Sequence, residues 1–341
     1  MAQGSGKRAG RPGLCLLLAG LLVSVAGVAQ SQEMRYLRIG TGGQSGTYFP
    51  VGSLIARAIS DIQRGPDCAE ERCGVPGLVA VAQISNGSVA NVAALQAGEI
   101  EMALVQADVA HWAYEGSEIF TAQPRHRRLR FAAHLYSEAM QIVVRRDAGV
   151  ESLADLRGRP VALDEPGSGT LIHVRNLLQV HGLREADTRP VYIKPDLAQA
   201  RIAAGSLDAF FIVAGWPTKA VSESLASGYG ALLAIGRDRV EQLVRTNPFL
   251  TPGTIPAEAY DGSPAIPSVM VGAHLLVRAD LPDAVVTALL EQMWSERGLA
   301  ILRGGHLRGA DIRLDSALSG RSVPLHDGAR AFYAKSGLRI D

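Results

Sequence analysis

The sequence has few of the residue groupings that catalytic or metal sites need. Only three cysteines occur among 341 residues, and none has a nearby histidine at the spacing of a zinc site. The eight histidines form no H-E-x-x-H pattern. Neither Ser45 nor Ser168 lies in a G-x-S-x-G elbow, and no lysine completes a phosphate-binding P-loop. We therefore expect no metal, no cofactor and no catalytic residues.

Excess charge of one sign and long apolar runs are also lacking. The formal net charge is +1, and loss of Lys7, Arg8 and Arg11 would change it to −2. This balance gives no reason to expect a nucleic acid or an anionic membrane surface as partner. After residue 29 no stretch is apolar and long enough to span a bilayer, so we expect a soluble product.

Residues 1–29 have the pattern of a secretory signal peptide. A basic start precedes the apolar segment 14–26, and the small residues Gly27 and Ala29 suit a cut after Ala29. Cys15 follows a leucine, which does not suit lipid attachment. We predict cleavage and export to the periplasm, with an uncleaved membrane anchor as the alternative.

Export leaves two cysteines, Cys68 and Cys73, in an oxidising compartment. They flank a short polar segment that follows the first expected helix. We predict a disulfide between them, which would contribute roughly 2 kcal/mol on the chain-entropy model.

The stretch 39–62 is read as a strand, a glycine-rich loop and a helix. Glycines at 40, 42, 43 and 46 allow a sharp turn, and Pro50 suits a first helical turn. Apolar residues from Val51 to Ile62 then recur on one helical face. The free N–H groups at such a helix start favour an anion.

A second loop repeats this design more than a hundred residues later. Both loops carry Ser-Gly-Thr at the helix start, at residues 45–47 and 168–170. The pair suggests two lobes that each offer a helix N-terminus to one ligand, and residues 30–341 exceed what one core usually organises. The alternative is that both are ordinary turns in one large α/β domain.

Strands and helices alternate through the rest of the chain, which indicates a mainly parallel sheet with ligands beyond the strand ends. The pattern predicts separate strands at 131–136 and 141–145, another strand at 269–277, and an irregular proline-rich connection at 248–267. Polar residues at expected strand ends describe a polar rim: Asn86, Ser88, Gln106 and Asp108.

Together these motifs resemble one family, the solute-binding subunits of TRAP transporters of the TAXI type (TRAP-associated extracytoplasmic immunogenic proteins). The likeness extends from about Tyr36 to Gly337. The motifs that carry it are Ile39–Gly43, Gly46–Pro50, Gly87–Asn91, Gln106–Ala110, Pro166–Thr170, Gly215–Pro217 and Pro324–Ala329. Two positions depart from the family's pattern, Ser137 where proline is common and Trp216 where tyrosine is common.

The resemblance implies an α/β fold like that of periplasmic binding proteins, a type II-like Venus flytrap with a central cleft. Lobe 1 would comprise residues 34–138 and 270–341, and lobe 2 residues 139–269. The chain would cross between the lobes near 137–141 and 267–271. The protein would be a non-enzymatic monomer that captures a small organic anion, such as glutamate or 2-oxoglutarate, for TRAP membrane subunits.

Ser45, Thr47, Ser168 and Thr170, with adjacent backbone N–H groups, are expected to hold the carboxylate oxygens. The other expected ligand-binding residues are Gly43, Gly46, Tyr48, Ser88, Asn91, Gln106, Asp108, Tyr136, Gly167, Gly169 and Trp216. Two other classes of function stay open. The same lobes could present a solute to a receptor kinase, and a secreted hydrolase could use Ser45 or Ser168.

Overall fold

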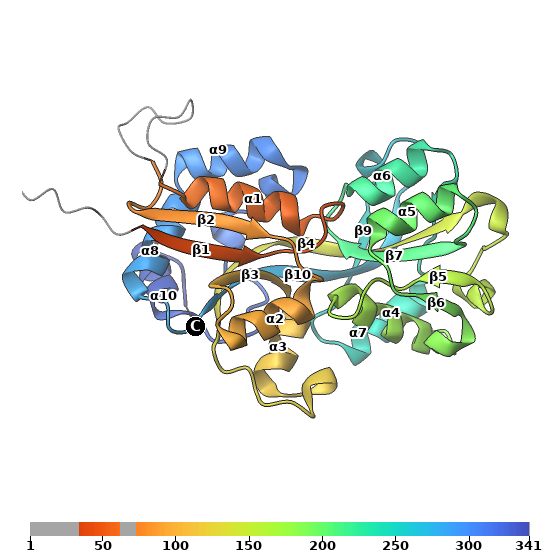
Figure 1. Cartoon of the computed structure of the whole chain (residues 1–341), viewed down its shortest axis with the longest axis horizontal. Helices are drawn as coiled ribbons and strands as arrows, with labels where there is room; N and C mark the ends of the chain where they lie inside the picture. The colour runs from red at the N-terminus through yellow and green to blue at the C-terminus, as the bar shows by residue number, and fades with distance from the viewer. Residues whose placement is uncertain (1–33, 62–72, 341) are drawn as a thin grey trace, which may run out of the picture. The chain divides into compact units, whose positions relative to one another are not determined.

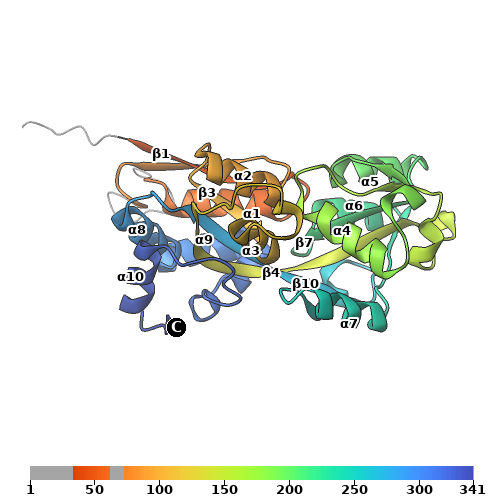
Figure 2. The ribbon, with the colours of Figure 1, turned by 90° about the horizontal axis from the view of Figure 1, so that it is seen from below.

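Two long strands cross the middle of the molecule and belong to both of its halves. They are β4, Leu129–Arg145, and β10, Ile266–Arg278, and they pair antiparallel with each other. Figure 2 shows β4 running through both halves. The sequence predicted two strands, 131–136 and 141–145, where the structure has β4 alone. The residues between them continue the ladder, because Ala139 pairs with β10 on one side and with β7 on the other.

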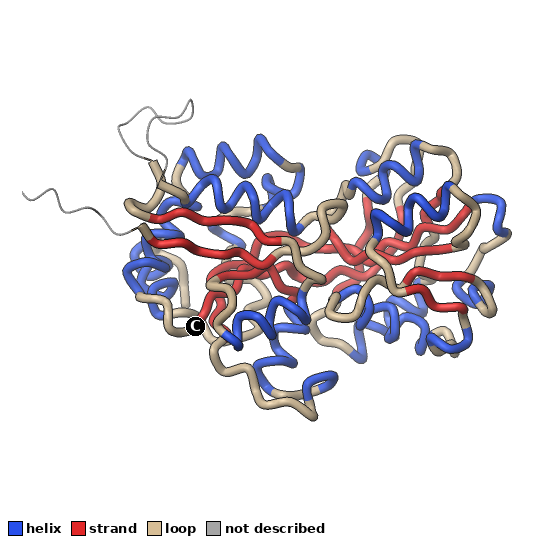
Figure 3. Tube along the Cα trace, in the orientation of Figure 1, coloured by secondary structure: helices blue, strands red, loops and turns tan. Residues whose placement is uncertain are grey.

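All strands of the described residues, 34–61 and 73–340 of this computed structural model, form one ten-stranded sheet with helices on both faces (Figures 1 and 3). The order is β2-β1-β3-β10-β4-β7-β5-β6, while β8 pairs with β4 and β9 with β10. Strands β1, β2 and β3 are parallel, as are β5, β6 and β7, and β10 runs against β3. Parallel strands joined by helices confirm the predicted α/β class.

Lobe 1 is built around β1–β3 and the C-terminal helices. Its elements are β1 (Arg35–Gly40), α1 (Tyr48–Ile59), β2 (Leu78–Gln83), α2 (Ser88–Ala97), β3 (Met102–Gln106), α3 (Ala107–Glu115), α8 (Asp283–Met293), α9 (Glu296–Gly305) and α10 (Asp327–Lys335). Helix α1 buries Val51, Ile55 and Ile59 against the sheet, in agreement with the predicted apolar face.

Lobe 2 is built around β5–β7. Its elements are β5 (Pro160–Ala162), α4 (Gly169–Val180), β6 (Arg189–Val191), α5 (Pro195–Ala203), β7 (Ala209–Ala214), α6 (Lys219–Ala226), β8 (Gly230–Leu232), α7 (Arg237–Thr246) and β9 (Thr251–Ile255). Strand β9 lies in the segment predicted to be irregular. The sequence of β9 shows no strand pattern, because Pro252 and Gly253 interrupt it, and the strand forms by pairing with β10.

The hydrophobic core changes from one lobe to the other within β4 and β10. On β4, Tyr136 belongs to the core of lobe 1 and Ala139 to that of lobe 2. On β10, the change falls between Val271 and Ala273. These positions lie close to the predicted lobe boundaries, which stay a prediction.

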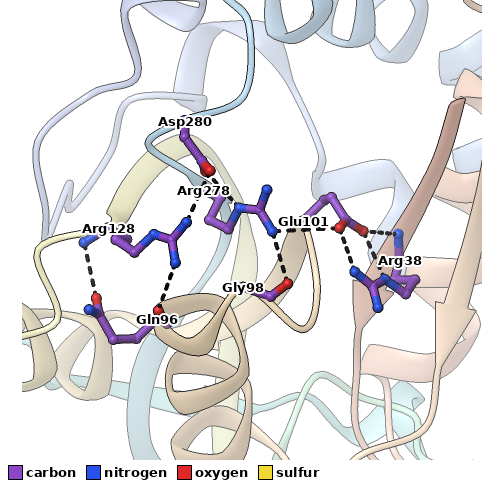
Figure 4. Close-up of polar contacts among 7 residues, drawn as sticks. All are labelled: Arg38, Gln96, Gly98, Glu101, Arg128, Arg278 and Asp280. Atoms are coloured by element: carbon purple, nitrogen blue, oxygen red, sulfur yellow. Dashed lines mark hydrogen bonds and ion pairs between the residues drawn. The ribbon is translucent and has the colours of Figure 1, made fainter.

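At one end of lobe 1 a charged network links β1, α2 and β10 with the residues just before β3 and β4 (Figure 4). Glu101, which is 9% exposed, accepts hydrogen bonds from Arg38 Nη2 at 2.6 Å and from the Arg38 backbone at 2.8 Å. Arg278 lies 3.6 Å from the same carboxylate. Burial raises the pKa of Glu101, but the hydrogen bonds and charge of Arg38 outweigh it and leave the pKa below its usual value.

We therefore expect Glu101→Gln to lower the free energy of unfolding by about 1–2 kcal/mol at pH 7, because it leaves Arg38 without its carboxylate and Arg278 with Asp280 alone. Urea denaturation measures the change. Glu115→Gln is the control, since the Glu115 pair with Arg127 is exposed and should contribute under about 1 kcal/mol. Equal losses of unfolding free energy in the two variants would contradict the expectation that the buried ion pair stabilises the fold more than the exposed one.

The predicted disulfide and signal peptide involve residues next to or outside the described ranges. Cys73 is disulfide-bonded, while its predicted partner Cys68 lies outside the described residues, as does the predicted signal peptide. Within residues 34–61 and 73–340, no helix is long and apolar enough to cross a membrane.

Candidate functional site

A cavity of about 60 Å3 lies where the two lobes meet. The first turns of α1, α2 and α4 all line it, so three helix N-termini with free N–H groups face one space. The volume counts the space open to the centre of a water-sized sphere, of which one water molecule needs about 10–15 Å3. The cavity therefore suits a compact ligand. Its lining residues are Gly42, Gly43, Ser45, Gly46, Thr47, Tyr48, Ser85, Asn86, Gly87, Ser88, Gln106, Glu138, Asp164, Ser168, Gly169, Thr170, Lys194, Pro195, Ile212, Val213 and Ala214.

The two Ser-Gly-Thr loops face this cavity from opposite lobes, as the sequence predicted. Ser45 is 4% exposed, and its hydroxyl has no partner among the described residues. Ser168 Oγ accepts the Leu171 N–H at 3.1 Å as the N-cap of α4, and Thr170 Oγ1 accepts the Val213 N–H at 3.1 Å. Each hydroxyl keeps its own hydrogen to donate, and the Asp164 carboxyl competes with a ligand for it, since burial raises the pKa of Asp164 and hydrogen bonds from both hydroxyls oppose that rise.

Thr47 is used differently from the other three hydroxyl residues. Its Oγ1 donates to the Gly215 carbonyl of lobe 2 at 2.6 Å. Since this bond takes the only hydroxyl hydrogen, Thr47 joins the lobes and has no donor left for a carboxylate.

Two buried acids face the cavity, and neither was predicted from the sequence to belong to the site. Glu138, on β4, is 1% exposed and accepts a hydrogen bond from Tyr48 OH at 2.8 Å. Burial raises the pKa of Glu138 to about 8, and the charge of Asp108 adds to this. Burial likewise raises the pKa of Asp164 to about 6. At neutral pH Glu138 is therefore largely protonated and can donate a hydrogen bond.

Hydrogen bonds beside the cavity join the two lobes. The Ala90 N–H donates to the Gly167 carbonyl at 2.9 Å, and Asn86 Nδ2 donates to the Pro166 carbonyl at 3.0 Å. Nearby, Asp108 of lobe 1 is fully buried against lobe 2. It accepts from Asn247 Nδ2 at 2.8 Å and lies 3.3 Å from His173 Nε2.

Five of the predicted ligand-binding residues do not line the cavity. They are Asn91, Asp108, Tyr136, Gly167 and Trp216. Asn91 joins β1 to β3, because it donates to the carbonyls of Thr41, just after β1, and of Leu104, within β3, at 2.7 and 2.9 Å. The other four lie at lobe contacts or beside them. Trp216, for example, stacks under Arg308 with the guanidinium 4.4 Å from the ring centre.

Other cavity residues were missed, among them Glu138, Asp164 and Lys194. Lys194 and Pro195 follow β6 and begin α5, so the strand-to-helix rule could have found them. Glu138 carries no such signal, because it lies inside a long strand and faces the cavity only through the position of β4 beside α1.

Residues 39–337 match the NMT1-like family. The chain belongs to the NMT1-like family.

Solved structures resemble this NMT1-like protein at low sequence identity. The periplasmic binding protein BugD is 14% identical with a TM-score of 0.53, and the match covers 88% of this chain and 93% of BugD. This likeness shows the fold, a two-lobed periplasmic-binding-protein fold of the type II kind.

Two sulfonate-binding proteins match the NMT1-like chain less well in structure. The periplasmic aliphatic sulphonate binding protein SsuA from Escherichia coli is 18% identical, with 88% and 83% of the two chains covered and a TM-score of 0.45. SsuA from Xanthomonas axonopodis pv. citri, bound to MOPS, is 18% identical with 90% and 95% covered and a TM-score of 0.45.

Proposed function

We propose that this protein is an exported, non-enzymatic solute-binding protein that closes its two lobes around a small organic anion. The observation that carries the proposal is the cavity between the lobes, where the N-termini of α1, α2 and α4 converge. Three positive helix ends and Lys194 favour a negative ligand. The proposed setting is the periplasm, where the chain acts as a monomer.

The proposed ligand is a compact carboxylate, such as a dicarboxylate or an acidic amino acid. Ser45, Ser168 and Thr170 donate to its oxygens together with backbone N–H groups. The protonated carboxyl group of Glu138 is a further donor at neutral pH. Ionisation of Glu138 at higher pH would add a negative charge beside the bound anion, so Glu138 also limits the pH range of binding.

The proposed partners are the membrane subunits of a TRAP-type transporter, and the motif resemblance to TAXI proteins supports this. A receptor kinase is the second candidate partner. Adjacent genes distinguish the two candidates, because TRAP permease genes indicate a transporter as partner and a histidine kinase gene indicates a receptor.

Calorimetry with a panel of small carboxylates and sulfonates tests the proposed function, since both groups present negatively charged oxygens to N–H and hydroxyl donors. We expect at least one to bind with micromolar affinity or better. Ser45→Ala should weaken that binding roughly tenfold or more, since a hydrogen bond to a charged group contributes about 1.5–3 kcal/mol. Ser53→Ala is the control, because the Ser53 hydroxyl donates to the Phe49 carbonyl within α1 and does not line the cavity. No binding across the panel would refute the proposal.

A further inference from the structure

A second and larger cavity lies on the other face of the two crossing strands. Its volume is about 560 Å3. Ser137 lines this cavity, whereas its neighbour Glu138 lines the cavity between the lobes. Successive side chains of a strand point to opposite faces. The two cavities are therefore on opposite sides of β4, and we name the second one the hinge cavity.

Both lobes contribute walls to the hinge cavity. Pro248, Phe249 and Thr251 come from lobe 2, while Ser319, Gly320 and Arg321 come from the C-terminal segment of lobe 1. The floor is formed by β4 and β10 at the point where the chain crosses between the lobes. A molecule in this cavity would contact both lobes at once.

Two histidines of the floor have nitrogen atoms without a hydrogen-bond partner among the described residues. They are Nε2 of His274, which is fully buried, and Nδ1 of His134. A Cβ atom built on Gly272 would lie 3.1 Å from the first nitrogen and 3.3 Å from the second, so both face the same part of the cavity wall. An unpaired buried nitrogen is costly, and a ligand atom there would relieve the cost.

The state of His274 is fixed by its surroundings. Burial lowers the pKa of His274 to about 3, so the ring is neutral at physiological pH. Nδ1 lies 3.0 Å from the Ser322 hydroxyl. When Ser322 donates to Nδ1, the ring proton is on Nε2, where it can be donated into the cavity.

The other residues that line the hinge cavity favour a particular charge and shape of ligand. Arg321 supplies a cation, and the described lining includes no aspartate or glutamate. Phe249 and Met270 offer apolar surface on the lobe 2 side. Imidazole donors and a guanidinium at one end and apolar groups at the other suit a carboxylate with a small apolar body.

We propose that the hinge cavity is a second binding site, specific for a small organic anion with an apolar body, and that its occupation favours the closed cleft. The coupling follows from the geometry of a hinge. When lobes rotate about β4 and β10, groups on one face approach while groups on the other face separate. The hinge cavity is therefore wider when the cleft is closed. A molecule that fills the hinge cavity binds the closed form better than the open form, so it stabilises the closed form. The relevance of this coupling to solute capture rests on the proposed function, but the site itself does not.

Calorimetric titration with benzoate tests the site in the full exported chain. Benzamide is the matched uncharged probe. We expect one benzoate per chain, with at least tenfold weaker binding of benzamide. Arg321→Gln should lower the affinity for benzoate tenfold or more. Ser137→Trp should abolish benzoate binding, because the indole fills the cavity from an exposed position on β4. Arg313→Gln, which changes an exposed arginine outside the cavity, should leave binding unchanged.

Two further variants separate the hinge cavity from the cavity between the lobes. Ser45→Ala should leave benzoate binding unchanged, and loss of binding in this variant would place benzoate in the other cavity and overturn the proposal. Gly169→Val, which obstructs closure of the lobes, should lower the affinity for benzoate severalfold. This measurement needs no ligand for the cavity between the lobes. Unchanged affinity in Gly169→Val would overturn the coupling. The absence of saturable benzoate binding, or equal binding by Ser137→Trp, would overturn the site.

Discussion

Replacement of Gly169 by valine is expected to weaken solute binding by more than a hundredfold while the chain still folds. Gly169 begins α4 and faces Gln106 of the other lobe. A Cβ atom at residue 169 would lie 1.8 Å from Gln106 Oε1. Gln106 is 2% exposed, so it can move only into the cavity between the lobes, or the lobes must separate. Either response removes the closed site.

The measurement combines solute calorimetry with small-angle scattering. In the wild type, saturating solute should reduce the radius of gyration, whereas in Gly169→Val it should not. Gly304→Ala is the matched control, because residue 304 lies in α9 with no atom within 4 Å of its would-be Cβ. Tight binding by Gly169→Val, or an unchanged radius in the wild type, would contradict closure around the solute.

The stability of the protein is expected to fall as pH rises from 6 to 8, and Glu138→Gln should abolish most of this fall. Burial holds the pKa of Glu138 at about 8, above its usual value near 4.5. The folded state therefore keeps a proton that the unfolded state releases, so the stabilisation is complete below pH 4.5 and is lost as pH approaches 8. The loss between pH 6 and 8 should be roughly 2–3 kcal/mol.

Urea denaturation at several pH values measures this effect. Asp164, with its pKa raised to about 6, contributes a loss of the same sign at lower pH, so the interval from pH 6 to 8 reports mainly on Glu138. The amide oxygen introduced by Glu138→Gln can still accept the Tyr48 hydroxyl hydrogen, and Glu291→Gln is an exposed control. A wild-type stability that does not change between pH 6 and 8 would refute the raised pKa. Anion affinity should fall over the same interval in the wild type only.

The amino-acid sequence determined the strand-loop-helix units and their glycine loops. Each is encoded within a contiguous segment, by the glycines that turn the chain and the apolar period that follows. The α/β class was therefore predictable, and so was the meeting of residues 45–47 with residues 168–170. The two loops meet because β1 and β5 run in opposite directions, so that both strands end where the lobes face each other. Ten of the fifteen predicted ligand-binding residues line the cavity.

Tertiary structure alone decided which polar groups face the cavity and which join the lobes. Glu138 faces the cavity because β4 lies beside α1, and Asp108 turns to His173 and Asn247 because α3 packs against lobe 2. Strand β9 exists because β10 pairs with it. These features depend on contacts between residues far apart in the chain. The local pattern of a segment fixes its own conformation, but the burial and hydrogen-bond partners of a side chain depend on elements it meets only after folding.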